Sequence, residues 1–385
     1  MLEGLQNINW QQLKHAYGPA TDVPDNLRDL ASPNREVREE ARYKLYGNIF
    51  HQGSRYEATP YAIPFIYELI HSPRVLRKDQ LVLLLLHLAL GYEEEYLPEG
   101  VNPKAFRDEL LLFDQSLTEE QRRKYANFGH SSAALINCYD VVRDGLPTLL
   151  PYLHQDDEPL KDAVVYVLAW FPELAATTLP AIVEVLKKAT GELEIAGAIL
   201  SIGLMTRRSS QDEYQTALHP YLEHTSKLIR TCATIALAQT PLSEEIAQAL
   251  IEGIASGQEF KHVKGLRFNE GRISGYVSMT LAEYGKSSKH QVLPALCLSL
   301  QGTTPYQSLD VTRAILSFFN SKRLQPITEV IVEELVTWEI DVLKAIYYHG
   351  GWGSEGSVFV DYARLLASHG LPDTKVALGK FLRID

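Results

Sequence analysis

The stretch from His51 to Glu57, His-Gln-Gly-Ser-Arg-Tyr-Glu, is the densest group of residues that could recognise another molecule. It connects two apolar segments, and binding residues often lie on such loops because a rigid scaffold holds them in place. Arginine and tyrosine are also enriched among the residues that dominate protein interfaces. We therefore predict a recognition patch for a protein or peptide, with Arg55 and Tyr56 as anchors, made of His51, Gln52, Arg55, Tyr56 and Glu57. The alternative is that the loop satisfies buried helix ends with its own side chains.

A second group of candidates lies in the most basic stretch of the chain, residues 256–275. Basic charge beside aromatic rings is typical of single-strand nucleic-acid binding. The cluster is local, however, and the chain has a formal net charge of −11, which disfavours partners that are bound through surplus Lys and Arg. We expect a protein partner, for which the acidity mildly favours a basic one, rather than nucleic acid or a membrane. The secondary candidates are Phe260, Lys264, Arg267, Phe268, Arg272 and, further on, Trp352.

The sequence contains no complete catalytic, cofactor or metal motif. Gly351-x-Gly353-x-x-Gly356 has the spacing of the dinucleotide fingerprint, but that fingerprint follows a strand, and the residues before it have a helical pattern. The stretch from Gly129 to Ala133 lacks the second glycine of a nucleophile elbow, and a serine that caps a helix explains it more simply. The twelve histidines are scattered, with no H-E-x-x-H. We predict no catalytic residue, no cofactor and no metal.

Repeated pairs of helices are expected to position these candidates. A proline, an apolar helix, a polar turn and a second apolar helix occur twice between Pro147 and Met205. Prolines of this kind recur about 40 residues apart, or at roughly double that spacing, which is the period of HEAT and armadillo repeats. Proline suits the first turn of a helix because its missing N–H would have no partner there. The prolines expected to start helices are Pro24, Pro64, Pro147, Pro180, Pro220 and Pro294.

A second signal marks the start of the second helix of a pair. It occurs as Val37-Arg38-x-x-Ala41, Leu160-Lys161-x-x-Val164 and Ile229-Arg230-x-x-Ala233, and its basic residues are expected to form a ladder with turn carboxylates of neighbouring units. In this pattern the chain resembles the HEAT-repeat family. His15-Ala16-Tyr17-Gly18, with His51-Gln52-Gly53 and Tyr56-x-Ala58-Thr59, is also similar to a group of bacterial HEAT-like proteins of unassigned function. The resemblance implies an all-α fold, a right-handed α-solenoid of helical hairpins that is elongated or curved. It implies no activity.

A solenoid grows by adding units, so the chain is interpreted as one domain despite its length. Trp10, Leu13 and Tyr17 have helical spacing and predict an amphipathic helix near the N-terminus. A polar, proline-containing loop and a charged helix capped at Thr118 interrupt the repeat period. The domain thus covers 1–385, with an N-terminal cap over 1–23, an insertion over 92–128 and a C-terminal cap over 321–385.

The sequence also indicates a compartment and a class of function. The first residues do not form a secretory signal, the apolar run Leu81–Leu90 is about half as long as a bilayer crossing, and the three cysteines show no pairing pattern. We expect a cytoplasmic protein. We predict a non-enzymatic scaffold that binds a protein or peptide through its concave face and irregular inter-repeat loops. The alternatives are a HEAT-like enzyme or nucleic-acid binder, similar to alkyl-base DNA glycosylases or bilin lyases, and an immunity- or antitoxin-type binder.

Overall fold

The computed structural model describes residues 1–209, 212–238, 242–255, 260, 262–319, 335–353 and 358–384. Over these residues the fold is helical, as expected, with two short antiparallel β-hairpins and an isolated bridge between Trp352 and Val358. The chain divides into two compact units. Unit 1 comprises Met1–Thr190 and Leu204–Tyr214, and unit 2 comprises Gly191–Gly203 and Gln215–Asp385. The interpretation of the chain as one array stays a prediction.

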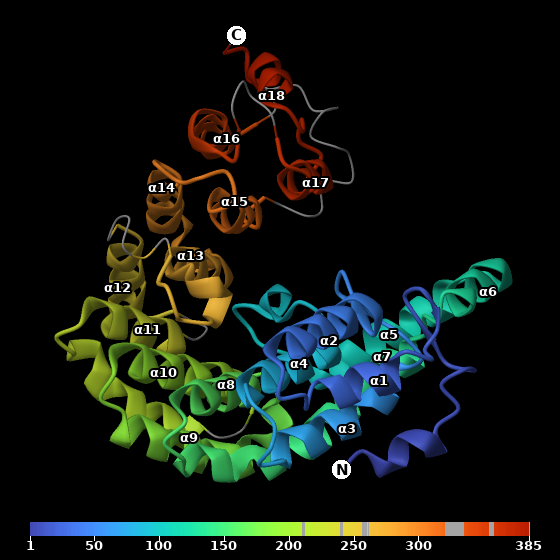
Figure 1. Cartoon of the computed structure of the whole chain (residues 1–385). Coiled ribbons are helices and arrows are strands. Elements are labelled where there is room, and N and C mark those ends of the chain that lie inside the picture. Colours follow the sequence, from blue (N-terminus) through green and yellow to red (C-terminus); the bar gives the residue numbers. More distant parts are fainter. Residues whose placement is uncertain are drawn as a thin grey trace. The chain divides into compact units, whose positions relative to one another are not determined.

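Unit 1 is built from packed helix pairs, such as α1 (Val23–Asp29) with α2 (Arg35–Asn48) and α3 (Thr59–His71) with α4 (Lys78–Leu90) (Figure 1). α4 holds the apolar run Leu81–Leu90, which is buried except at Leu83 and His87, so it is the core helix that the sequence predicts. The other elements are η1 (Glu3–Asn7), β1 (Lys14–His15), β2 (Gly18–Pro19), β3 (Phe50–His51), β4 (Ser54–Arg55), η2 (Glu93–Tyr96), α5 (Pro103–Ser116), α6 (Glu119–Asn127), α7 (Ser132–Gly145), η3 (Leu146–His154), α8 (Glu158–Leu168), η4 (Pro172–Leu174) and α9 (Ala175–Lys188).

The N-terminal segment differs from the amphipathic helix predicted within residues 1–23. It forms η1 and the β1–β2 hairpin instead. Gly18 has a φ of 120°, and Pro19 lacks the N–H that a helix needs, so a helix cannot continue through this pair. Of the residues at helical spacing, Trp10 is buried, whereas Tyr17 is 72% exposed.

Four of the six prolines expected to start helices lie inside them instead, whereas Pro24 and Pro147 lie in a first turn as predicted. Pro24 occupies the first turn of α1, but Pro64 and Pro180 lie inside α3 and α9. An interior proline removes one backbone hydrogen bond and tends to bend the helix. In α3 the first turn belongs to Pro60 instead, because the helix already begins at Thr59.

The basic residues of the repeated motif lie near the start of α2, α8 and α11 (Lys227–Leu237), as predicted, but the two arginines among them make a different contact. Arg38 donates from Nη1 to the carbonyls of Ser32 and Pro33, both at 2.8 Å. Arg230 donates in the same way to two carbonyls of the turn before α11. Each guanidinium therefore closes the turn of its own hairpin and does not pair with carboxylates of a neighbouring unit.

Unit 2 is also built from packed helices, including α11 with α12 (Glu244–Ala255) and α13 (Ile273–Tyr284) with α15 (Ser308–Leu316). Two of the three divisions between the units lie within α10 (Glu192–Arg207) and η5 (Asp212–Glu223), and the third precedes α10. Within the described ranges no single helix is long and apolar enough to cross a membrane. One pair of consecutive segments, α8 with η4–α9, reaches that length and apolarity when combined, but the two are bent by 101° relative to each other. The other elements are η7 (Phe268–Gly271), η8 (Lys286–Ser288), α14 (Lys289–Ser299), α16 (Thr337–His349), α17 (Val360–Ser368) and α18 (Lys375–Leu382).

Candidate functional site

The predicted recognition patch forms the β3–β4 hairpin and the residues that follow it. Phe50 pairs with Arg55 and His51 with Ser54, and the two turn residues between them have positive φ, 50° at Gln52 and 82° at Gly53. Two consecutive left-handed residues are the signature of the tight turn that matches the twist of antiparallel strands. Gln52 is exposed, and His51 and Glu57 are half-buried.

The two expected anchors lie inside unit 1. Arg55 is 7% exposed and Tyr56 is 5% exposed, which differs from the prediction that both present themselves on the surface. Arg55 donates to the carbonyl of Gly53 at 2.7 Å and to that of Ala89, at the end of α4, at 3.4 Å. The loop therefore satisfies a carbonyl at the end of α4, which is the alternative role predicted for it from the sequence. Arg55 is buried because it makes this contact.

Arg55 forms no ion pair with a described carboxylate, and the nearest negative group, Glu95 of η2, acts on it only at longer range. Its recorded partners are the two carbonyls, and its Nε has no acceptor. Burial lowers its pKa, but a guanidinium stays charged at any physiological pH. The nearby thiol of Cys138 does not compensate for this charge, because burial raises the pKa of Cys138 to about 12 and keeps it neutral.

A cavity of about 300 Å³ opens beside this arginine, and we call it the Arg55 pocket. β4 supplies one wall, α5 and the turn after it supply the apolar wall, and α6 and the start of α7 close the rest. Its lining residues are Ser54, Arg55, Leu110, Phe113, Asp114, Leu117, Tyr125, His130, Ser131, Ser132 and Leu135.

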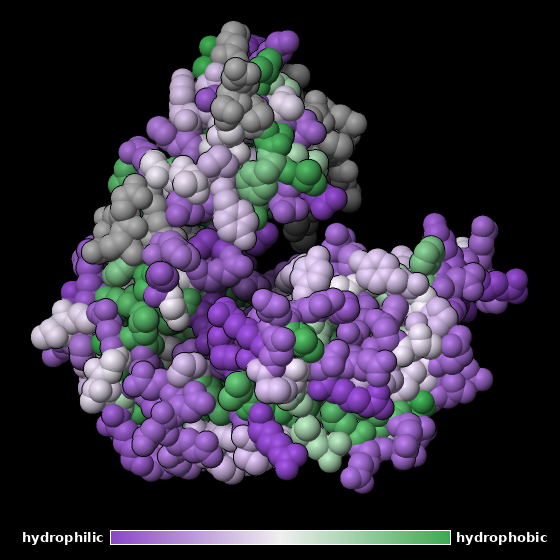
Figure 2. All heavy atoms as spheres, viewed as in Figure 1, coloured by the Kyte–Doolittle hydropathy of each residue, from purple (hydrophilic) through white to green (hydrophobic). Residues whose placement is uncertain are grey.

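The α5–α6 hairpin beside the pocket carries several exposed apolar side chains, and we call this group its apolar face. α6 has no buried residue, and Figure 1 places it at the margin of unit 1, away from α3 and α4. In Figure 2 its polar side chains form a purple tip, next to which apolar residues appear in green. The large apolar side chains of this face are Leu111 (49% exposed), Leu112 (61%), Phe113 (45%), Tyr125 (40%) and Phe128 (59%).

Polar contacts hold the hairpin against the rest of unit 1. Ser132 donates to the carbonyl of Leu110 at 2.9 Å, and Arg107 forms an ion pair with Asp140 of α7 at 2.6 Å. The amide of Glu57 donates to the carbonyl of Gly129 at 2.9 Å, so the predicted patch is tied directly to the loop between α6 and α7. The elements that line the Arg55 pocket are therefore held together by hydrogen bonds and an ion pair.

His51 contributes to a different hollow, of about 320 Å³, with Tyr17, Asp22 and α2. The amide of Ala16 donates to the carbonyl of Asn48 at the end of α2 at 3.0 Å, and the rings of Tyr17 and His51 meet edge-on with centroids 5.5 Å apart. Tyr17 and Tyr43 are 72% and 78% exposed there. The hairpin thus divides the predicted patch between two hollows.

A tyrosine, a histidine and a carboxylate also line up in unit 1. Tyr46 lies 2.5 Å from Nδ1 of His87, whose Nε2 is 3.5 Å from a carboxylate oxygen of Glu93. The order resembles that of a catalytic triad, but burial raises the pKa of Tyr46 and lowers that of His87. Both groups stay neutral, and the three residues form a network that joins α2, α4 and η2.

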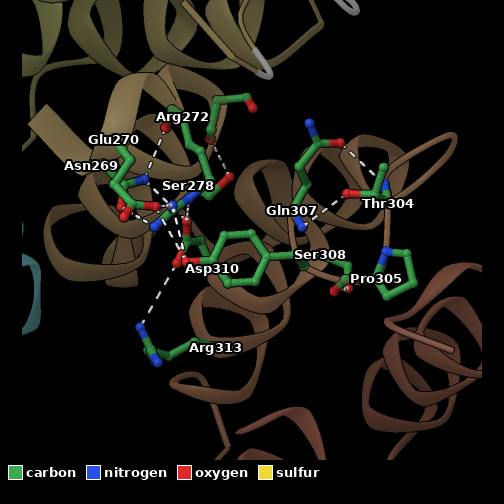
Figure 3. Close-up of polar contacts among 12 residues, drawn as sticks. Asn269, Glu270, Arg272, Ser278, Thr304, Pro305, Gln307, Ser308, Asp310 and Arg313 are labelled. Atoms are coloured by element: carbon green, nitrogen blue, oxygen red, sulfur yellow. Dashed lines mark hydrogen bonds and ion pairs between the residues drawn. The ribbon is translucent and has the colours of Figure 1, made fainter. Parts of the chain in front are cut away.

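The basic stretch of unit 2 is organised around Arg272 (Figure 3). Its guanidinium donates to Asp310 at 3.1 Å and to Asn269 at 2.9 Å, and it also pairs with Glu270. Asn269 and Glu270 hold left-handed φ values of 49° and 51°, and Asp310 is 3% exposed. The guanidinium of Arg272 is thus already bound by Asp310, Asn269 and Glu270.

The other secondary candidates are not arranged for base stacking. Phe260 is 5% exposed and Phe268 is 1% exposed, so both rings belong to the core of unit 2 and are not placed as the nucleic-acid alternative would need. Lys264 is exposed and Arg267 is half-buried.

The glycine-rich stretch falls partly outside the described residues, which omit 354–357. Its described part follows helix α16 and not a strand. A Cβ on Gly351 would lie 2.6 Å from the ring of Tyr362, so this glycine permits close packing. Trp352 donates its indole N–H to the carbonyl of Ile346 at 2.9 Å and packs edge-on against Tyr362.

The sequence prediction missed the residues of α5, and it took the N-terminal part of the insertion for a loop. A detectable signal was present: Asn102 and Pro103 are a helix start, and the run Leu110–Phe113 gives the following helix more apolar residues than one buried stripe requires. The capping box of α6 at Thr118 and Gln121 is confirmed, as is the helix-capping role of Ser131.

Comparison with known proteins names no family. No family model matches the chain, and no curated protein matches it. Among solved structures, the chain is similar to one described as the crystal structure of an engineered protein, at 15% identity over 94% of this chain and 89% of that chain, with a TM-score of 0.30. Searching the described residues also finds no group of three His, Cys, Asp or Glu side chains that could hold a metal ion.

Proposed function

We propose that this chain is a non-enzymatic helical-repeat scaffold, a right-handed solenoid of HEAT-like helix pairs, that binds a protein or peptide partner. The binding surface we assign is the apolar face of the α5–α6 hairpin together with the Arg55 pocket. One observation carries the assignment. Five large apolar side chains on and just after this hairpin are 40–61% exposed, beside a pocket that contains a buried arginine.

An exposed apolar face of this kind is typical of an interaction surface. Covering a half-exposed Leu or Phe side chain stabilises a complex by roughly 1 kcal/mol, and aromatic side chains concentrate in the cores of interfaces. α5 buries Phe106 against unit 1, but α6 buries no residue of its own, so packing within unit 1 does not explain α6.

The alternatives have weaker support. Nucleic-acid binding by the basic stretch would need Phe260 and Phe268 at the surface, and both are buried. The free cysteines Cys138 and Cys232 are buried thiols, which is compatible with the cytoplasmic location that we keep as part of the proposal. An immunity-type binder would be a special case of the same function, with a basic toxin as the partner.

The assignment is tested by partner capture from the native cell with a double variant, Leu112→Ser and Phe113→Ser. The matched control is Leu76→Ser with Tyr43→Ser, two side chains that are 57% and 78% exposed and belong to other segments. We expect one set of partners on the wild-type and control proteins and its loss from the α5–α6 variant. Equal capture by all three proteins would place the binding surface elsewhere, and capture of no partner would reject the function.

A further inference from the structure

Arg55 differs from the other buried charged side chains of the described residues. Asp79 pairs with Arg77 at 2.9 Å, and Asp310 pairs with Arg272 at 3.1 Å. The other two buried carboxylates, Glu93 and Glu339, accept hydrogen bonds from a tyrosine hydroxyl and a backbone amide. Arg55 is the one buried cation among them; it forms no ion pair, its Nε has no acceptor, and the carboxylate of Glu95 acts on it only at longer range. A buried charge that is not closely paired is unfavourable, so the guanidinium can accept a further anionic partner.

The wall next to Arg55 favours an anion. Ser131 and Ser132 line the pocket at the start of α7, a helix of 14 residues. The first amides of a helix have no partner within it, and its N-terminus carries a partial positive charge. In α7 the amide of Ala134 already donates to the capping Ser131 side chain, so the helix contributes mainly through this charge. Arginine binds carboxylates through two parallel hydrogen bonds. The pocket thus combines a guanidinium with the positive end of a helix.

The opposite wall is mostly apolar, although the carboxylate of Asp114 is also among its lining residues. Leu110, Phe113 and Leu117 supply it from α5 and the turn after it, and the ring of Tyr125 packs edge-on against Phe113. A volume of about 300 Å³ is at the low end for ligand pockets. It suits a single large residue and not a run of several. The occupant must therefore bring a carboxylate and an apolar side chain on one residue.

Within a protein, this combination exists only at the C-terminus. An internal Asp or Glu carries its carboxylate in place of an apolar side chain, whereas a C-terminal Leu or Phe carries both groups. We propose that the Arg55 pocket receives the C-terminal residue of a protein partner, with the terminal carboxylate at Arg55 and the apolar side chain against α5 and α6. This inference rests on the proposed function, because the same surface binds the rest of the partner.

The test measures fluorescence anisotropy of labelled short peptides on the full chain. The probes end in Leu, Phe, Ile or Val with a free carboxylate, and each has a C-terminally amidated twin. We expect saturable binding of at least one free acid and a weakening of about tenfold to a hundredfold on amidation, as is typical for a lost hydrogen bond to a charged group. Absence of binding by every free acid, or equal binding of both twins, overturns the inference.

Two variants locate the binding site. Arg55→Met should lose the preference for the free acid, and Leu117→Trp should block the pocket while it leaves the arginine in place. Arg28→Met, which changes an exposed arginine on α1, is the matched control and should bind as the wild type does. An Arg55→Met protein that is folded and still prefers the free acid overturns the inference, and so does unchanged binding by Leu117→Trp if the other variant does not fold.

The same variants separate this inference from the proposed function. If the α5–α6 double variant loses its partner but Arg55→Met and Leu117→Trp retain it, the surface is correct and the C-terminal residue is not its ligand. If 3-phenylpropionate neither displaces a bound peptide nor distinguishes wild type from Arg55→Met, it does not bind at Arg55. A small apolar acid is then excluded as the occupant of the pocket. Tight binding of 3-phenylpropionate without any peptide binding would replace the protein terminus by a small-molecule ligand and overturn the inference.

Discussion

Replacing Arg55 with methionine should make unit 1 more stable and its pocket unable to bind a carboxylate. Methionine keeps an unbranched apolar stem but brings no charge into the interior. The substitution gives up two hydrogen bonds to carbonyls, and the bond to Ala89 is long at 3.4 Å, so the loss is about 1–2 kcal/mol. Against this, an arginine that is 7% exposed and has no close ion pair, only the longer-range field of Glu95, costs several kcal/mol of desolvation.

The balance predicts a rise of about 1–2 kcal/mol in the free energy of unfolding of Arg55→Met, equivalent to roughly 2–8 °C in Tm for a unit of about 200 residues. Urea titration followed by far-ultraviolet circular dichroism, without added peptide, measures it. Arg77→Met provides a control of opposite sign, because it leaves the buried Asp79 without its partner and should lower stability by about 1–3 kcal/mol.

A loss of more than about 1 kcal/mol in Arg55→Met would refute the reasoning. Arg55 would then be a structural clamp between the hairpin and α4, and not a charge held in place for a ligand. Added peptide gives a second measurement on the same proteins. A free-acid peptide should raise the Tm of the wild type, because it binds the folded state, and should leave the Tm of Arg55→Met unchanged.

Three further outcomes follow from contacts outside the pocket. Arg272→Met leaves Asp310 without its nearest counter-ion and should lower the free energy of unfolding of unit 2 by about 3–5 kcal/mol in urea, whereas unchanged stability would contradict the network of Figure 3. Gly203→Ala places a Cβ 2.4 Å from that of Ala236 and 2.5 Å from its Cα, so overpacking should cost about 1–3 kcal/mol and lower the Tm. Burial lowers the pKa of His87 from its ordinary 6.5, so its contribution to stability is full above pH 6.5 and is lost as the pH falls towards the folded pKa. His87→Gln should reduce the change in the free energy of unfolding with pH below pH 6.5. An unchanged slope in this range would show that other groups cause the pH dependence.

The helical architecture could be predicted because its signals are local. The apolar run of α4, the serine that caps α7 and the capping box of α6 each act within about one helical turn, and all three are confirmed. The N-terminal hairpin shows the limit of this reasoning. The spacing of Trp10, Leu13 and Tyr17 fits a helix, but the backbone restrictions at Gly18 and Pro19 outweigh it.

The candidate site could be predicted only as a stretch of chain. The segment from His51 to Glu57 does reach the pocket, yet the burial of Arg55 depends on α4, η2 and α7, whose contacts with it span long sequence separations. Composition favours arginine and tyrosine as exposed anchors in general, and nothing local shows that these two are covered. The apolar face of α5 was missed for a different reason: the acidic and proline-rich start of the insertion suggested a loop throughout.

The two β-hairpins of unit 1 show that the fold does not itself require an arginine at position 55. Each hairpin consists of two strands of two residues, and each is followed by the first helix of a helix pair, α1 or α3. The partner of Lys14 in the first is Pro19, and the partner of Phe50 in the second is Arg55. Pro19 is exposed and donates no hydrogen bond, yet its hairpin forms. A buried, unpaired charge at the matching position of the second hairpin is therefore better explained by a bound carboxylate than by the needs of the turn.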